Sequence, residues 1–207
     1  MKIFSAQQIR EWDAYSIQHE PISSIDLMER ASTSFANWFM ARFSTAQPIK
    51  IFAGIGNNGG DGLAIGRILQ ENGYEVSLFV VQFSNHSSAD FRQNEQRLGQ
   101  PANYLTSNSA LPQLTGEEVV IDGIFGSGLS RPITGWVGDL IIHINQNSRC
   151  IIAVDIASGL FADSANSPTD TIIKPHHTVS FQTPKLAFMM PQNEAFVGTW
   201  HLLDIGL

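Results

Sequence analysis

Short runs of apolar residues alternate with segments of helical periodicity from residue 49 onward, and this alternation limits the fold more than any other feature. Strands are predicted at residues 49–53, 76–81, 119–121, 150–154, 178–181 and 200–205. Helices are predicted between them at about 63–71 and 90–98, and around 141–144. Near-continuous apolar strands that alternate with helices are typical of a parallel sheet covered on both faces. We therefore predict an α/β fold with a mainly parallel central sheet and helices on both faces.

The first 45 residues are predicted to be helical. Ser5 and Gln8 have the spacing of a capping box, and a second helix is predicted to begin near Ser23 or Ser24. Its apolar side chains recur at steps of three and four, which indicates a buried stripe. These residues are Leu27, Ala31, Phe35, Trp38 and Phe39. We interpret them as core, with ligand stacking by Trp38 as the alternative. We predict one domain over residues 1–207, with a helical lead-in at 1–45 and the sheet at 49–207.

Composition excludes several classes of protein. Only 15% of the 207 residues are charged and 43% are hydrophobic, which argues against disorder. The formal charge of −7 argues against a nucleic-acid partner, because phosphates favour a positive face. No apolar run approaches the roughly 18–20 residues that span a bilayer, so no membrane partner is expected. A lone cysteine, Cys150, cannot form an internal disulfide, and a cytoplasmic location is therefore expected.

Three polar, glycine-rich loops follow three of the predicted strands. They span residues 54–62, 122–129 and 155–160. In a parallel sheet the carboxyl ends of all strands lie at one edge, and ligands bind there. The three loops are therefore expected to form one binding site.

The first loop contains G-x-G-x-x-G at Gly54, Gly56 and Gly59. An ordinary NAD site also requires an acid at the end of the second strand, and residues 79–83 contain none. The loop is not a phosphate-binding loop of the Walker type either, because no Gly-Lys-Ser/Thr follows. A tight turn that needs positive φ is the simpler explanation. We favour phosphate and sugar binding at a helix start, because five glycines, two asparagines and an aspartate exceed what a turn requires.

Two aspartates, Asp122 and Asp155, end separate strands and are expected to lie near each other. Paired carboxylates in a cleft repel unless one is protonated or a cation joins them. Together with Asn58 and Ser158 they form a hard-cation set of oxygen ligands. The alternative is that each aspartate caps its own loop. Lys185, which follows a further strand, either brings an amine to the same edge or is a surface lysine.

The three loops together resemble those of the NAD(P)H-hydrate epimerases, the YjeF N-terminal domain family. The resemblance covers essentially the whole chain, and its most specific block is Asn57-Asn58-Gly59-Gly60-Asp61. It implies a Rossmann-like three-layer sandwich, usually dimeric, that interconverts the R and S forms of hydrated NADH and NADPH. These forms carry a hydroxyl at C6 of the nicotinamide ring, and a separate or fused dehydratase repairs only the S form.

The resemblance also assigns roles to residues of this sequence. Substrate phosphates and ribose would be held by Asn57, Asn58, Gly59, Gly60 and Asp61, and by Gly126, Ser127, Gly128, Leu129, Ser130, Arg131 and Pro132. Asp155 would also contact the substrate. Asn58, Asp122 and Ser158 would bind one potassium ion per subunit. Lys185 matches a lysine that commonly follows the family's late strand. One departure is Ala157, where the family usually has proline, which relaxes the φ of the loop but retains its neighbours.

Inversion at C6 requires a proton acceptor and a proton donor. We hypothesise that Asp155 fills this role, with Lys185 or Asp122 adjusting it electrostatically. Two other functions stay open. One is a non-catalytic nucleotide-binding or scaffolding module of the same fold, and the other is an NAD-dependent dehydrogenase, which the missing second-strand acid disfavours. The sequence would also suit the N-terminal half of a bifunctional epimerase/dehydratase.

Overall fold

The computed structural model describes residues 2–20 and 22–207; Met1 and Pro21, which fall in the predicted domain range, lie outside them. Within the described residues, seven strands form one sheet. They are β1 (Ile49–Ala53), β2 (Val76–Val81), β3 (Asn103–Leu105), β4 (Val119–Gly123), β5 (Cys150–Val154), β6 (His177–Phe181) and β7 (Thr199–Leu203). Their order is β3-β2-β1-β4-β5-β6-β7, and every pairing is parallel. The predicted parallel sheet is confirmed.

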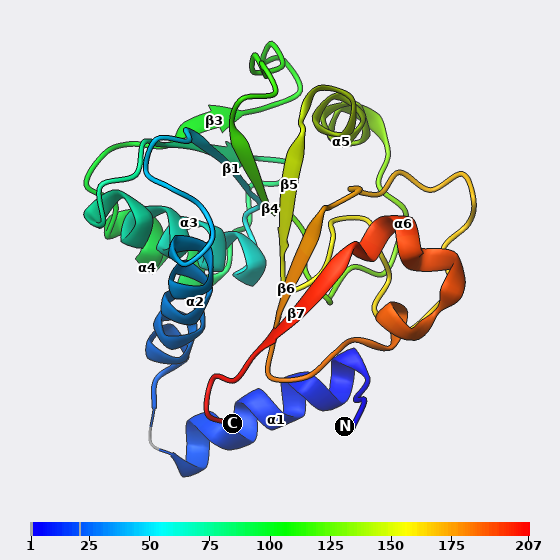
Figure 1. Cartoon of the computed structure of the whole chain (residues 1–207). Coiled ribbons are helices and arrows are strands. Elements are labelled where there is room, and N and C mark those ends of the chain that lie inside the picture. Colours follow the sequence, from blue (N-terminus) through cyan, green and yellow to red (C-terminus); the bar gives the residue numbers. More distant parts are fainter. Residues whose placement is uncertain (1, 21) are drawn as a thin grey trace.

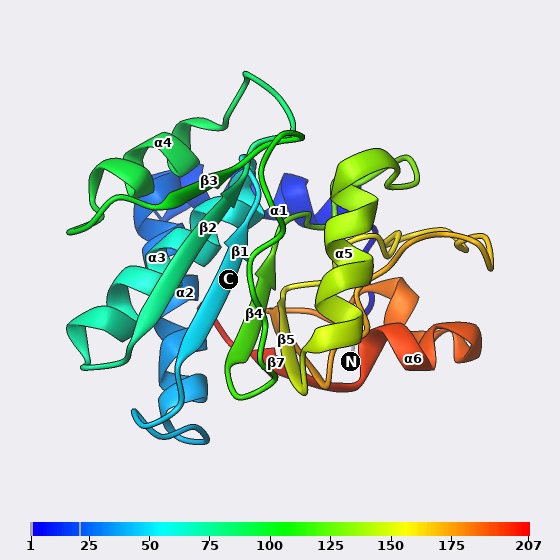
Figure 2. The same cartoon turned by 90° about the horizontal axis from the view of Figure 1, so that it is seen from above.

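Helices cover both faces of this sheet (Figures 1 and 2). They are α1 (Ala6–His19), α2 (Ser24–Met40), α3 (Asn57–Glu71), α4 (Ala89–Gln96), α5 (Gly135–Asn147) and α6 (Glu194–Val197), with short 3₁₀ turns at Leu186–Met189 and Pro191–Asn193. Figure 2 shows α2, α3 and α4 on one side of the sheet and α5 and α6 on the other. The α1 helix belongs to neither layer and runs below the sheet in Figure 1.

Each face of the sheet has its own hydrophobic core. Along β1, Phe52 packs into the core on the α5 side, whereas Ile51 and Ala53 pack into the core on the α2–α3 side. This alternation is the period of two that a strand imposes on its side chains. Because both faces are covered, β1 is apolar almost throughout, and this is the pattern that the sequence displays.

The two leading helices begin where the sequence predicts. Ser5 caps α1 and forms the complete capping box with Gln8, and Ser23 caps α2. All five residues of the predicted stripe on α2 are buried. Trp38 packs against His177 and His201 and lies outside the cavity described below, so the core interpretation is confirmed.

The start of α3 differs from the prediction. The helix begins at Asn57 rather than near residue 63, with the extended Gly56 as its N-cap, so most of the first polar loop is helical. None of the glycines from 54 to 62 has positive φ, and the tight-turn explanation is therefore wrong. Close packing explains several of them: a Cβ on Gly59 would lie 1.7 Å from the Gly54 carbonyl oxygen. A helix that starts so close to the sheet brings its first turn to the strand ends.

Smaller differences concern strand ends. The β4 strand continues to Gly123, so Asp122 is part of the strand, and β7 ends at Leu203 rather than 205. The short β3 was not predicted. Among the described residues, no helix has both the length and the hydropathy to cross a membrane.

Candidate active site

A cavity of about 730 Å³ lies at the carboxyl edge of the sheet. Its walls include residues from all three polar loops, among them Asn58, Phe125 and Asp155. The loops after β1 and β4 meet here, where the chain order on the sheet reverses direction. This topological switch point is the usual ligand site of an open parallel sheet. The prediction that the three loops share one site is confirmed.

An ion pair joins two walls of this cavity. The Lys185 ammonium donates to Oδ1 of Asp155 at 2.6 Å and to the Ser180 hydroxyl at 3.0 Å. The Lys185 side chain is 1% exposed and that of Asp155 is 16% exposed. Asp155 Oδ1 also accepts from the Ser180 hydroxyl at 3.0 Å. A carboxylate that faces a cavity and is held in place by a buried amine can exchange a proton with a ligand in that cavity.

The backbone around this pair is strained. Asp155 has φ 63° and Gln182 has φ 58°, and these are the non-glycine residues of positive φ in the described chain. Both residues line the cavity. Non-glycine residues in this region cost about 1–3 kcal/mol each, and such strain gathers at functional sites.

A second polar cluster lies behind the cavity wall, around Asp122. Its carboxylate is fully buried and accepts from the Ser158 hydroxyl at 2.6 Å, the Ser158 N–H at 2.8 Å and the Ile124 N–H at 3.2 Å. Burial raises the pKa of Asp122 to about 6, although these hydrogen bonds lower it. No lysine or arginine of the described residues pairs with this carboxylate.

The Phe125 carbonyl connects this cluster to the cavity. It accepts from the Asn58 amide at 3.1 Å and lies 3.3 Å from the Ser158 hydroxyl oxygen. Carboxylate, hydroxyl and carbonyl oxygens are thus gathered around one point. This donor set is of the hard, oxygen-only kind.

Comparison with known proteins identifies the family. The family model described as "YjeF-related protein N-terminus" matches residues 24–187. The chain belongs to this family. It is 32% identical over 194 residues to an NAD(P)H-hydrate epimerase of Limosilactobacillus fermentum, which covers 94% of this chain and 92% of the relative. A protein of the same name from Oenococcus oeni is 31% identical and covers 98% and 96%.

Two further matches extend this result. A bifunctional NAD(P)H-hydrate repair enzyme of Coxiella burnetii is 31% identical over 99% of this chain, which corresponds to 41% of that enzyme. The crystal structure of the yeast protein YNL200c superposes with a TM-score of 0.77 and 24% identity, covering 98% of this chain and 88% of that one. This likeness confirms the fold.

Most residues that the sequence analysis selected face the cavity of this YjeF-related chain. The lining residues among them are Asn57, Asn58, Asp61, Gly126, Ser127, Gly128, Leu129, Ser130, Arg131, Asp155 and Lys185. Asp122 and Ser158 lie in the second cluster instead. Gly59, Gly60 and Pro132 do not line the cavity. The two glycines have a packing role, since a Cβ on Gly60 would lie 2.9 Å from the sulfur of Met28.

One wall of the cavity is formed by α1 and α2 and not by the three polar loops. From α1 come Ile9, Arg10, Trp12, Asp13, Ala14 and Ile17. From α2 come Ser24, Leu27, Met28 and Ala31. Sequence reasoning missed them because an amphipathic helix over a cavity has the same periodicity as one over a core. The signal that could have found them is an aspartate, Asp13, between apolar positions of α1.

The cavity is rich in carboxylates. Burial raises the pKa of Asp61 well above its ordinary value, and the charges of Asp155, Asp13 and Asp90 raise it further. Asp90 accepts from the Ser24 hydroxyl at 2.6 Å. Acidic groups held close together and away from water disfavour the charged form of one another.

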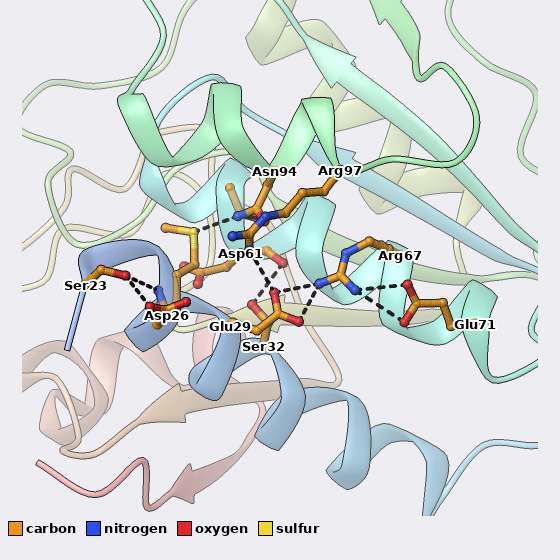
Figure 3. A network of polar contacts seen from close by, with 11 residues as sticks. Ser23, Asp26, Glu29, Ser32, Asp61, Arg67, Glu71, Asn94 and Arg97 are labelled. Atoms are coloured by element: carbon orange, nitrogen blue, oxygen red, sulfur yellow. Dashed lines mark hydrogen bonds and ion pairs between the residues drawn. The ribbon is translucent and has the colours of Figure 1, made fainter.

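Ion pairs among α2, α3 and α4 hold this part of the cavity in place (Figure 3). Glu29 on α2 lies between Arg67 on α3, at 2.6 Å, and Arg97 after α4, at 3.5 Å. Nearby, Asn94 donates to the Gly60 carbonyl at 3.2 Å. These contacts fix the first turn of α3, which carries Asn58 and Asp61, relative to α2 and α4.

Proposed function

We propose that this chain is an NAD(P)H-hydrate epimerase that interconverts the R and S forms of hydrated NADH and NADPH. The observation that carries the proposal is the Asp155–Lys185 pair, buried against a cavity of about 730 Å³. Relatives of similar length that carry this name are 31–32% identical over nearly the whole chain.

The proposed binding mode follows from the cavity walls. The first turn of α3 presents free N–H groups beside Asn57 and Asn58, and such groups bind phosphate without a lysine. Arg131, an exposed lining residue, adds a positive charge. A dinucleotide held there would place its reduced ring toward Asp155. That carboxylate would take a proton from water or from the C6 hydroxyl, and Lys185 would stabilise the charge that develops.

A non-catalytic nucleotide-binding module is the second candidate. Its support is Ala157, where the family usually has proline. Ala157 is buried and does not line the cavity, and the nearby Asp155 and Ser158 are retained. We further propose that residues 1–207 form one domain of a cytoplasmic homodimer, whose S product passes to a dehydratase that is either separate or fused, as in the bifunctional Coxiella burnetii relative. The single cysteine supports the cytoplasmic location.

Replacement of Asp155 by asparagine tests the function. Purified protein is incubated with the pure R hydrate, and the R to S ratio is followed by chromatography. The wild type should reach the equilibrium ratio, and Asp155→Asn should lower kcat by about 100-fold or more, because the acid–base group is lost. Asp139→Asn, the same change on the exposed face of α5, should match the wild type. A wild type that binds the hydrate and leaves its stereochemistry unchanged would instead establish the binding module.

We also propose that Asn58, Asp122 and Ser158 bind one potassium ion. The donor set fits, since Asp122 is a buried carboxylate without a cationic partner among the described residues and its neighbours are oxygens. Asn58 now turns its amide nitrogen to the Phe125 carbonyl, so its amide would have to rotate to present the oxygen. When bound, the ion would supply positive charge that offsets Asp122 beside the substrate loop.

Exchange of the salt tests the ion site. Potassium chloride should raise the melting temperature more than sodium chloride at equal ionic strength, because a ligand that binds the folded state stabilises it. Asp122→Asn should abolish the difference between the two salts. Equal melting temperatures in both salts for the wild type would contradict the proposal.

A further inference from the structure

One titratable group of the cavity has no part in the function proposed above. Asp13 is a half-buried residue of α1 that lines the cavity, and no hydrogen bond or ion pair to its carboxylate is found within the described residues. By contrast, Asp155 is held by Lys185 and Asp90 by Ser24. Asp13 is therefore free to bind a ligand.

Asp13 and Asp155 line the same cavity from different elements of the fold. Asp155 follows β5 at the sheet edge, whereas α1 crosses below the ends of β6 and β7 (Figure 1). Residues of α1 and the residues that follow β5 and β6 line the cavity together. Burial raises the pKa of Asp13, and the charge of Asp155 raises it further while Lys185 lowers it. The two carboxyls are thus close enough for their charges to interact.

The α1 helix is anchored at both of its ends. Its first N–H, on Ala6, donates to the Asp163 carboxylate at 2.8 Å, and Glu20 just after the helix pairs with Arg30 at 2.7 Å. Arg30 also donates to the Ile205 carbonyl at 3.1 Å. Asp13 lies midway between these anchors, so its position against the sheet edge is set by the fold.

We propose that Asp13 is a second acid–base group of this site, which acts on the face of the substrate ring opposite Asp155. The inference rests on the proposed epimerase function. Inversion at C6 by loss and return of water needs a proton donor on the face from which the hydroxyl leaves. It also needs a proton acceptor on the face to which water adds. A single carboxylate fixed on one wall serves only one face.

The proposed step is balanced and redox-neutral. The lone pair of the ring nitrogen forms the N1=C6 bond as the C6–O bond breaks, and the leaving oxygen takes a proton from Asp13 and departs as water. A water molecule on the other face then adds its oxygen to C6, and the N1=C6 electron pair returns to nitrogen. Asp155, beside Lys185, takes the proton that this water loses. The reverse direction exchanges the two roles.

Kinetics of matched variants test the inference. Asp13→Asn should lower kcat by about 100-fold or more in both directions and change the KM for the hydrate less than threefold, because the variant keeps the shape of the cavity. Glu11→Gln is the control: Glu11 is exposed on α1, where it bonds to Gln7, and its loss should leave kcat unchanged. Asp13→Glu should restore part of the activity lost in Asp13→Asn.

Two outcomes would overturn the inference. In one, Asp13→Asn keeps a kcat within threefold of an active wild type. In the other, Asp61→Asn rather than Asp13→Asn abolishes turnover with binding retained, which would assign the second group to α3. A wild type that does not epimerise the hydrate would refute the proposed function itself, and is recognised before any variant is made.

Discussion

Asp155 combines a left-handed backbone with a side chain that binds a buried lysine. Neither property helps the chain to fold: the first costs about 1–3 kcal/mol, and a buried ion pair often contributes little net stability. The Asp155 N–H is nevertheless held by the Val179 carbonyl at 2.8 Å, which fixes the residue in place. Strain that the surrounding structure maintains at a cavity wall is consistent with the catalytic role that we propose for Asp155.

Gly59 provides a test at the scale of one residue. Helix propensity alone predicts that Gly59→Ala in α3 would stabilise the protein by up to about 1 kcal/mol. The close approach of Gly54 predicts the opposite, because the new Cβ would lie 1.7 Å from a backbone oxygen. We expect a loss of about 3 kcal/mol in the free energy of unfolding, measured by denaturant titration.

Gly99→Ala is the matched control, because a Cβ there meets nothing within 4 Å. Its unfolding free energy should stay within about 0.5 kcal/mol of the wild type. A stabilised Gly59→Ala would mean that the start of α3 does not pack against the strand end as described.

At the scale of elements, the two edges of the sheet differ. The proposed active site lies at the carboxyl edge, and a structural ion pair lies at the opposite edge. Lys50 of β1 pairs with Glu118, which directly precedes β4, at 2.5 Å. Thr115 adds bonds from its N–H and its hydroxyl to the same carboxylate. Glu118 is 3% exposed, so its charge depends on these partners.

The pH dependence of stability tests this pair. Burial of Glu118 raises its pKa, but the bonds from Lys50 and Thr115 outweigh burial and lower it to about 2, from an ordinary 4.5. A carboxyl whose pKa is depressed on folding stabilises the protein above its unfolded pKa. This contribution is lost as the pH falls toward the folded value. The free energy of unfolding of the wild type should therefore exceed that of Glu118→Gln by up to about 3 kcal/mol at pH 7.

The difference in the free energy of unfolding between the wild type and Glu118→Gln should be constant above about pH 5 and shrink between pH 4.5 and 2. Urea titrations at several pH values across this range measure this difference. The contributions of the other carboxyl groups cancel in the difference, because both proteins contain these groups. A difference that does not depend on pH would show that the pair contributes through shape rather than charge.

At the scale of the whole molecule, the cavity is assembled from segments far apart in the chain. Asp13 of α1, Asn58 of α3, Asp155 after β5 and Lys185 after β6 line it together. The parallel sheet makes this possible, because every strand delivers its following loop to the same edge. The α1 helix then encloses that edge from outside both helical layers (Figure 1).

Much of this arrangement follows from local patterns. The apolar runs predict six of the seven strands, and the Ser5 and Ser23 caps predict the two leading helices. The three-residue β3 was missed because so short a segment carries no period. The start of α3 was misplaced because Gly59 and Gly60 disfavour a helix by propensity, whereas packing against Gly54 and Met28 requires them.

The sequence by itself determined the α/β class, the parallel sheet and the three loops that meet at its edge, because periodicity and composition are local properties. Only the tertiary structure decided that Asp155 binds Lys185, that Asp122 lies behind the wall with Ser158, and that α1 brings Asp13 to the cavity. These relations depend on how distant segments pack in three dimensions. No spacing along the chain encodes them, because the packing energy of one segment depends on the positions of all the others.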